Sequence, residues 1–304
     1  MKSITFYSFK GGTGRTTIAA NLSTRLAIRG FNTSIIDFDI FSSGLANFFP
    51  NLNPVYYLQN IIADSLENYS EIAENNRNRE ILPEEYFRDI NFQRTIYDYR
   101  NTINNIFNNF YFREGGNIYI IPSTNRILES EYRIMDDIIS RRNLIDDFSM
   151  YRILFSILRR YQNILDENYK LEYFFIDSPS GLSDLAQTPL SISEYLIVVL
   201  TTDNQSLSGT TYFLNWVMNE YSRTLKGIYI IFNMVKPNIP ENIIVDRYNA
   251  MIYNLRDRYV RFDFKIINEL NVFESGEKIL KQDDNGYSIF EDLTDSILRF
   301  INSD

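Results

Sequence analysis

The sequence predicts an α/β fold: a mostly parallel, twisted sheet with helices on both faces and one helical insertion. Short apolar runs typical of buried strands alternate with segments of helical spacing along much of the chain. A glycine-rich loop separates the first such strand from the first such helix. Strands joined through helices require right-handed crossovers, which give parallel pairing. With 304 residues and 44% hydrophobic side chains, the chain can bury a large core, so we expect one domain over residues 1–304.

The first helix is expected at about residues 16–29. Ile18, Leu22 and Leu26 share one face there, and Gly30 gives a stop signal. Strands are expected, in chain order, at residues 4–7, 33–36, 116–123, 173–176, 195–200 and 228–232.

The alternation fails between the second and third of these strands, where we expect a helical insertion at about residues 50–115. Residues 68–112 are rich in Asn, Tyr, Arg and Glu. The insertion is either a partner-binding surface or a cap on the core, and its aromatic residues at helical spacing favour the cap. The side chains with that spacing are Ile103, Ile106, Phe107 and Phe110.

Residues 8–17 (SFKGGTGRTT) have the features of a phosphate-binding loop. Gly11, Gly12 and Gly14 permit left-handed backbone angles, so that successive N–H groups can point at phosphate oxygens beside the positive end of the next helix. The Thr16 hydroxyl would hold Mg²⁺. The alternative is an ordinary glycine-rich turn, which the strand, the Thr pair and the helix pattern around the loop disfavour.

The loop departs from the general phosphate-binding pattern at both basic positions. Lys10 precedes the glycines, the first Gly of the general pattern would fall at Phe9, and Arg15 replaces the usual lysine. The loop resembles the deviant Walker A motif of the ParA/MinD ATPases, which are SIMIBI-class P-loop NTPases, in the arginine-variant branch written KGGVGR. The resemblance implies that Lys10 reaches a partner subunit's nucleotide, that Arg15 contacts the β/γ-phosphates and that Thr17 contacts the α-phosphate.

The resemblance continues after the second expected strand, in Asp37-Phe38-Asp39. This stretch is similar to the family's first switch, which implies that Asp39 positions the attacking water and lies near the metal. A carboxylate at the carboxyl end of a parallel strand is also where open α/β sheets bind ligands. Asp37 is either a cap of the loop or a supporting group behind the metal.

Three later segments extend the resemblance. The strand ending at Asp177 and the turn at Gly181 look like the Walker B strand and second switch, which implies that Asp177 lies near Mg²⁺ through a water and that the Gly181 amide senses the γ-phosphate. Residues 201–209 (TTDNQSLSG) resemble the arginine-variant branch. Asn233 matches the asparagine that faces adenine, although an Asn after a strand is commonly a turn former.

The resemblance therefore implies an active site that combines catalytic, nucleotide-binding and metal-binding residues. The catalytic residues would be Lys10, Arg15 and Asp39; the nucleotide contacts Gly11, Gly12, Thr13, Gly14, Arg15, Thr16, Thr17, Gly181 and Asn233; and the metal contacts Thr16, Asp177 and Asp39.

Composition removes several other chemistries. The sequence contains no Cys and no His, so it has no ligands for an iron–sulfur cluster or a Cys/His zinc site, no histidine base and no thiol nucleophile. There is no signal peptide and no apolar stretch long enough to span a bilayer, so we expect a cytoplasmic protein.

Charge gives expectations about partners. The net charge of −9 argues against nucleic acid coating the whole surface. Local basic stretches keep DNA as a candidate partner, against the alternative of solvated helix faces. The acidic polar face of residues 287–301 would be repelled by anionic lipid, so we expect a helix docked on the core and no membrane binding. The basic stretches are Arg152, Arg159 and Arg160, and Arg256, Arg258, Arg261 and Lys265.

Taken with the resemblance, these features imply an ATPase that forms a homodimer with ATP and Mg²⁺. It would hydrolyse ATP to ADP and phosphate to drive the partition or positioning of a cargo, either DNA or a protein complex, together with a protein partner. The alternative is a nucleotide-regulated interaction switch with little or no turnover, because a guanidinium is broader than an ammonium group. A MinD-like membrane-positioning ATPase is a third interpretation.

Overall fold

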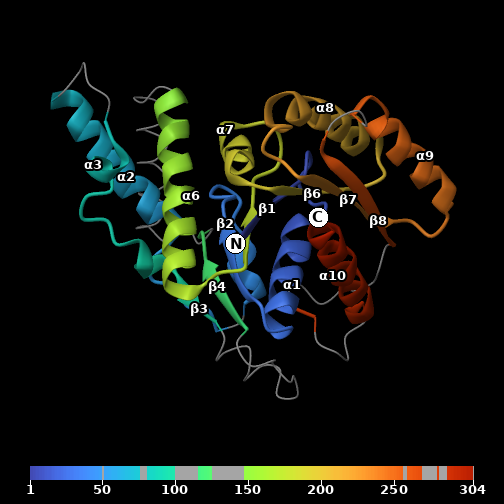
Figure 1. Cartoon of the computed structure of the whole chain (residues 1–304), viewed down its shortest axis with the longest axis horizontal. Helices are drawn as coiled ribbons and strands as arrows, with labels where there is room; N and C mark the ends of the chain where they lie inside the picture. Colours follow the sequence, from blue (N-terminus) through green and yellow to red (C-terminus); the bar gives the residue numbers. More distant parts are fainter. Residues whose placement is uncertain are drawn as a thin grey trace.

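The computed structural model describes residues 1–49, 51–75, 81–99, 116–124, 147–255, 259–268, 279–280 and 286–303. The strands in this part of the chain are β1 (Lys2–Tyr7), β2 (Asn32–Asp37), β3 (Tyr97–Asp98), β4 (Asn117–Ile121), β5 (Tyr173–Asp177), β6 (Tyr195–Leu200), β7 (Gly227–Val235) and β8 (Arg261–Asn268). They form one eight-stranded sheet in the order β3-β4-β2-β5-β1-β6-β7-β8 (Figure 1). Only the β3–β4 pair is antiparallel among the described strands, so the predicted mostly parallel α/β fold is confirmed.

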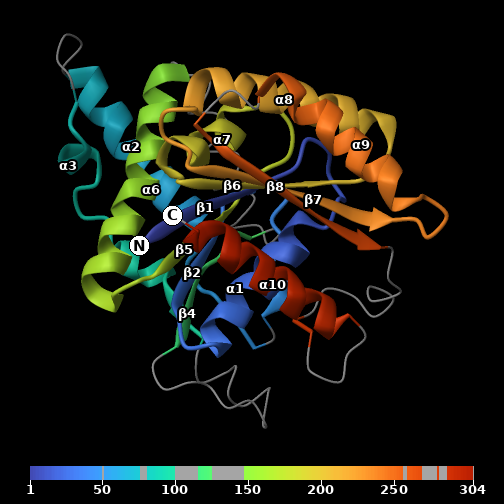
Figure 2. The ribbon, with the colours of Figure 1, turned by 45° about the vertical axis from the view of Figure 1, so that its right-hand side comes forward.

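Helices cover both faces of the sheet. The α-helices of the described residues are α1 (Arg15–Ile28), α2 (Leu58–Asn75), α3 (Pro83–Tyr86), α6 (Asp147–Tyr169), α7 (Asp184–Gln187), α8 (Asn204–Tyr221), α9 (Glu241–Ile252) and α10 (Tyr287–Asn302). Short 3₁₀ turns are η1 (Leu45–Phe48), η2 (Phe92–Thr95), η3 (Thr188–Ile192) and η4 (Tyr253–Leu255). Figures 1 and 2 show α1 and α10 on one face, and α6, α7, α8 and α9 on the other.

The strand side chains explain this layering. In β5, Tyr173 and Phe175 join the core under α1 and α10, whereas Phe174 and Ile176 join the core under α6. Both faces of the strand are apolar because helices cover both, as is usual for parallel sheets. The carboxyl ends of the central strands are thereby fixed at one edge of the molecule, where the glycine-rich loop begins.

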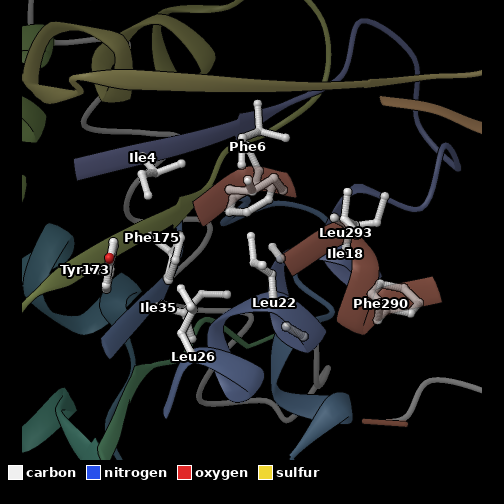
Figure 3. Close-up of a cluster of buried hydrophobic side chains, with 14 of the residues drawn as sticks. Ile4, Phe6, Ile18, Leu22, Leu26, Ile35, Tyr173, Phe175, Phe290 and Leu293 are labelled. Carbon is white, nitrogen blue, oxygen red and sulfur yellow. The ribbon is translucent and has the colours of Figure 1, made fainter. Parts of the chain in front are cut away.

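The core beneath α1 holds the first helix and the last helix together. Ile18 and Leu22 on α1 lie between the strand residues and Leu293 on α10 (Figure 3). The spacing that predicted the first helix is therefore confirmed, and α10 is docked on the core, as its apolar face predicted. Its acidic face meets basic side chains: Glu291 lies 2.5 Å from Arg29, and Asp292 pairs with Lys265.

The predicted insertion contains both helix and strand. The buried side chains of α2 pack in the same core as those of α6. The sequence did not predict β3, which pairs with β4 through Tyr97↔Ile120 and Asp98↔Tyr119. The apolar residues expected at helical spacing between 103 and 110 lie outside the described residues.

Candidate active site at the glycine-rich loop

The glycine-rich loop leaves β1 and enters α1 at the carboxyl edge of the sheet. It borders a cavity of about 320 Å³. Gly12 and Gly14 have φ values of 76° and 83°, the left-handed region that favours glycine. The cavity is lined by Ser8, Gly11, Gly12, Thr13, Gly14, Arg15, Thr16, Thr17, Asp39, Ser42, Gly44, Phe48 and Ser180.

Asn233 supports this loop from β7. Its Nδ2 donates a hydrogen bond of 2.8 Å to the Thr13 carbonyl, and a Cβ added at Gly14 would lie 2.5 Å from the same nitrogen. The sequence placed Asn233 just after a strand, whereas the structure places it inside β7, where the pairing with β8 becomes irregular. The close approach at Gly14 means that only glycine fits there without displacing Asn233.

Arg15 is the first residue of α1, and its side chain lies among carboxylates. Its Nε donates to Asp177 Oδ1 at 2.6 Å, its Nη2 to Asp39 Oδ2 at 2.9 Å and its Nη1 to Ser8 Oγ at 3.3 Å. Only 8% of the side chain is exposed. Burial alone would lower the pKa of Arg15, but the charges of Asp177 and Asp39 and their hydrogen bonds raise it above its ordinary value.

The carboxylates come from the ends of two neighbouring strands. Asp37 on β2 lies directly opposite Asp177 on β5 in the sheet register, and Asp39 follows two residues after Asp37. Asp37 accepts the backbone N–H groups of Asp39 and Leu45, each at 3.2 Å. Complete burial, followed by the charges of Asp177 and Asp39, raises the pKa of Asp37 well above its ordinary range. These two hydrogen bonds favour the loop-capping role for Asp37 over a role at the metal.

The donor atoms at this edge fit a magnesium ion. Mg²⁺ prefers oxygen ligands and is held in nucleotide sites by one or two carboxylates together with phosphates and waters. Thr16 and Asp39 both line the cavity, and Asp177 Oδ2 is buried without a hydrogen-bond partner among the described residues. The described residues contain no group of three or more His, Cys, Asp or Glu side chains that could hold a metal ion by themselves.

Gly181 and Lys10, two further predicted site residues, both contact other residues of the same chain. The Gly181 N–H donates to the Ser8 carbonyl at 3.2 Å, and the Tyr7 hydroxyl donates to the Gly181 carbonyl at 3.1 Å. Lys10 Nζ lies 3.6 Å from Asp203 Oδ1, and 44% of the Lys10 side chain is exposed. The sequence did not predict a role for Tyr7 or Asp203. The position of Tyr7 directly before the loop could have indicated that its side chain lies near the site.

The basic residues outside the loop are spread over separate elements. On α6, Arg152 donates to the Ile81 carbonyl and Arg159 donates to Gln162. On β8, Arg261 donates to the Ser303 carbonyl, while Lys265 pairs with α10. Arg256 and Arg258 lie outside the described residues. The two predicted basic stretches therefore do not merge into one patch within the described structure.

The predicted site residues thus divide into two groups. The structure brings together Arg15, Asp39 and Asp177 by direct contacts, and it joins Asn233 and Gly181 to the loop through backbone groups. The other predicted residues line the loop cavity, except Lys10, which faces Asp203. No described helix is both long and apolar enough to cross a bilayer.

The sequence is similar to known proteins in its first three quarters. Residues 1–230 match the family model described as AAA domain. A septum site-determining protein MinD from Neisseria meningitidis is 50% identical over 46 residues, a match that spans 15% of this chain and 16% of that protein.

Solved structures extend the likeness to nearly the whole chain. The cell division ATPase MinD of Pyrococcus furiosus is 18% identical, with a TM-score of 0.63 over 98% of this chain and 99% of that one. MinD of Pyrococcus horikoshii complexed with Mg-ADP is 19% identical, with a TM-score of 0.62 over 99% and 97% of the two chains. A putative plasmid partition protein of Borrelia burgdorferi bound to AMPPNP is 18% identical, with a TM-score of 0.54 over 98% of both chains.

At these identities the structural matches establish a shared fold, while the family model covers most of the sequence, including the glycine-rich loop and the strands that end in Asp37 and Asp177. This chain therefore belongs to the AAA-domain family, and it has the P-loop fold of the MinD and plasmid partition proteins.

Proposed function

We propose that this chain binds ATP with Mg²⁺ in the loop cavity, hydrolyses it to ADP and phosphate, and forms a homodimer while ATP is bound. The observation that carries the proposal is the position of Asp39 and Asp177 at the ends of β2 and β5, beside the glycine-rich loop and Thr16. Phosphoryl transfer to water depends mainly on positioning and charge neutralisation. The carboxylates would hold the water and the metal ion in position, and the loop N–H groups, Arg15 and the metal ion would neutralise phosphate charge.

Each residue has a defined task in this proposal. The loop N–H groups and the N-terminus of α1 hold the phosphates, and Arg15 and Thr17 add contacts to the β/γ- and α-phosphates. Asp39, with 14% of its side chain exposed, orients the attacking water. Thr16 and, through a water, Asp177 would hold Mg²⁺, which supplies positive charge to the phosphates when bound. Lys10 is exposed enough to reach a partner subunit's nucleotide.

We further propose that the dimer, one domain per chain, acts in the cytoplasm to partition or position DNA or a protein complex, together with a protein partner. The similar structures support this cargo class, since their names describe a cell division ATPase, a septum site-determining protein and a putative plasmid partition protein. The docked, acidic α10 gives no support to membrane positioning. Sedimentation with anionic vesicles tests that point, and we expect the protein to stay in the supernatant with ATP.

A second candidate function is an interaction switch with little turnover. It is favoured by the contacts of Arg15, which must leave two carboxylates before it can reach a phosphate. A steady-state phosphate-release assay with Mg²⁺·ATP, with and without DNA, separates the two candidates. Release that requires Mg²⁺ supports the ATPase. Tight ATP binding without release in either condition would support the switch, and no ATP binding would refute both.

A further inference from the structure

The Arg15 side chain is bound to the two carboxylates to which the proposed function assigns a metal ion and a water. Its Nε and Nη2 are bound to Asp177 and Asp39, the two carboxylates assigned to that chemistry. Both contacts lie in a buried region, since 8% of the Arg15 side chain and 1% of the Asp177 side chain are exposed. A buried pair of ionised carboxylates without a cation is strongly unfavourable, and a positive charge between them stabilises the ionised forms of both.

We propose that Arg15 is the resting counter-ion of the metal site: without nucleotide its guanidinium replaces the divalent cation, and it leaves Asp177 and Asp39 when the metal and nucleotide enter. This inference rests on the proposed function for the identity of the incoming cation. Arg15 would then have two positions. In the resting position its guanidinium binds the carboxylates, and in the second position it faces the phosphates.

The geometry allows both positions without a large movement of the backbone. Arg15 lines the loop cavity while its tip contacts the carboxylates, so rotation about its side-chain bonds keeps the guanidinium beside the loop. Asp177 Oδ2, which has no partner among the described residues, is the atom left over when the guanidinium binds only Oδ1. The single guanidinium therefore offsets one of the two negative charges and leaves one carboxylate oxygen without a hydrogen bond.

Arginine fits this resting position better than lysine would, because its guanidinium is planar. A guanidinium presents several N–H groups in a fixed fork, and here three different nitrogens contact Asp177, Asp39 and Ser8. An ammonium group is a point charge and would have to favour one carboxylate over the other. The replacement of the usual loop lysine is thus explained by the resting state as well as by the phosphates.

The test measures binding of Mn²⁺ alone to the nucleotide-free protein, by the electron paramagnetic resonance of free Mn²⁺. Wild-type protein should bind Mn²⁺ weakly at this site, while Arg15→Gln should bind it at least about tenfold more tightly, the scale expected for one charged contact. Lys10→Gln is the matched control, because it removes the same charge from the same loop without touching Asp177, and its Mn²⁺ affinity should stay near that of wild type. Folded Arg15→Gln with wild-type Mn²⁺ affinity would overturn the proposal.

A double variant locates the site. Arg15→Gln combined with Asp177→Asn should lose the gained Mn²⁺ affinity, whereas retention of the gain would place the ion elsewhere and refute the inference. Because this assay contains no nucleotide, its outcome is independent of whether the protein hydrolyses ATP. Failure to bind ATP would refute the proposed function and leave the Mn²⁺ result standing.

A measurement on the wild-type chain covers the case in which Arg15→Gln does not fold. The Nε–Hε signal of Arg15, assigned by comparison with Arg15→Lys, should be protected from exchange without nucleotide, because that group is bound to buried Asp177. The signal should shift when the protein is saturated with Mg²⁺ and a non-hydrolysable ATP analogue. Calorimetry of the same sample shows when saturation is reached. An unchanged Arg15 signal at saturation would show that the contact persists and that the exchange does not occur.

Discussion

At the scale of single residues, the two carboxylates that hold Arg15 differ in their access to solvent. Asp177 is almost completely buried at the end of β5, whereas Asp39 lies beyond the end of β2 and borders the cavity. Burial raises the pKa of Asp39, while Arg15 opposes that shift. Asp39 is therefore the carboxylate that can meet a water molecule, and Asp177 is the one that anchors the guanidinium.

We predict that Asp39→Ala binds ATP but hydrolyses it at least about 100-fold more slowly, because the group proposed to orient the water is lost while the proposed phosphate contacts remain. The variant should accumulate as an ATP-bound dimer in light scattering, and phosphate release should be measured alongside. Asp263→Ala, which removes an exposed carboxylate on β8, is the control and should behave as wild type. Normal turnover by Asp39→Ala would exclude the role assigned to it.

At the scale of elements, the start of α8 connects the loop lysine to a helix cap. Asp203 is the N-cap residue, and its Oδ1 accepts the Ser206 N–H at 3.1 Å. The Thr201 hydroxyl donates to the other carboxylate oxygen at 2.5 Å. These two hydrogen bonds, and then the Lys10 charge, lower the pKa of Asp203. The partner of Lys10 is therefore held in one position by its own helix.

We predict that Asp203→Ala lowers the free energy of unfolding by about 1 kcal/mol, the usual value for loss of an N-cap, and that Asp203→Asn loses less because its amide oxygen still accepts Ser206. The pH dependence has a definite sign. Because the folded pKa is lowered, the carboxylate contribution is present above the ordinary Asp value of about 3.9 and is lost as pH falls through the lowered pKa. Urea unfolding between pH 5 and pH 3 should show this loss in wild type and not in Asp203→Asn; equal slopes would contradict the assignment.

The last helix gives a second test at this scale, because its apolar and charged faces should contribute unequally. Leu293 on α10 is completely buried, so we predict that Leu293→Ala lowers the free energy of unfolding by about 2–5 kcal/mol through cavity formation. Asp295→Ala removes only the contact with Arg29 at a side chain that is 54% exposed, and it should cost less than about 1 kcal/mol. Urea unfolding of both variants measures the difference. Similar small losses would mean that α10 is only loosely attached.

At the scale of the whole molecule, one sheet joins the elements that carry the site. Asp39, Asp177 and Asn233 follow or belong to strands from different parts of the sequence, yet all three lie at the same edge around the loop. Lys10 is the exception, because it faces outward toward Asp203 and remains substantially exposed. A cation in that position can serve a neighbouring molecule more readily than its own cavity.

We predict that Mg²⁺ with a non-hydrolysable ATP analogue doubles the mass of the wild-type protein in light scattering, and that Lys10→Ala binds the analogue but stays monomeric. The reason is that Lys10 lies outside the group of residues that line the cavity, so its loss leaves the contacts within one chain in place. Lys226→Ala, which removes an exposed lysine paired with Glu194, is the matched control and should still dimerise. Joint loss of binding and dimerisation in Lys10→Ala would make Lys10 a ligand of its own nucleotide.

The sequence predicts much of this arrangement because the relevant signals are local. The glycines beside Lys10, the apolar run before Asp177 and the spacing of α1 each occupy a few consecutive residues. The contacts of Arg15 with Asp177 and of Tyr7 with Gly181 could not be predicted in this way, because they join positions more than 160 residues apart. The strand β3 was missed for a different reason: two residues carry no periodicity, and β3 exists only because β4 offers it a pairing edge.

The position of β1 within the sheet also determines when the site can assemble during synthesis. β1 ends at Tyr7, but its two neighbours, β5 and β6, begin at Tyr173 and Tyr195. At 5–20 residues per second, a ribosome needs on the order of 10–30 s to produce the chain between β1 and β5. During that time β1 lies outside the ribosomal exit tunnel without the two strands that pair with it. An apolar segment with unpaired backbone groups can bind chaperones and can start aggregation. Slower translation ahead of Tyr173 should therefore lower the yield of folded protein more than equal slowing after Leu200.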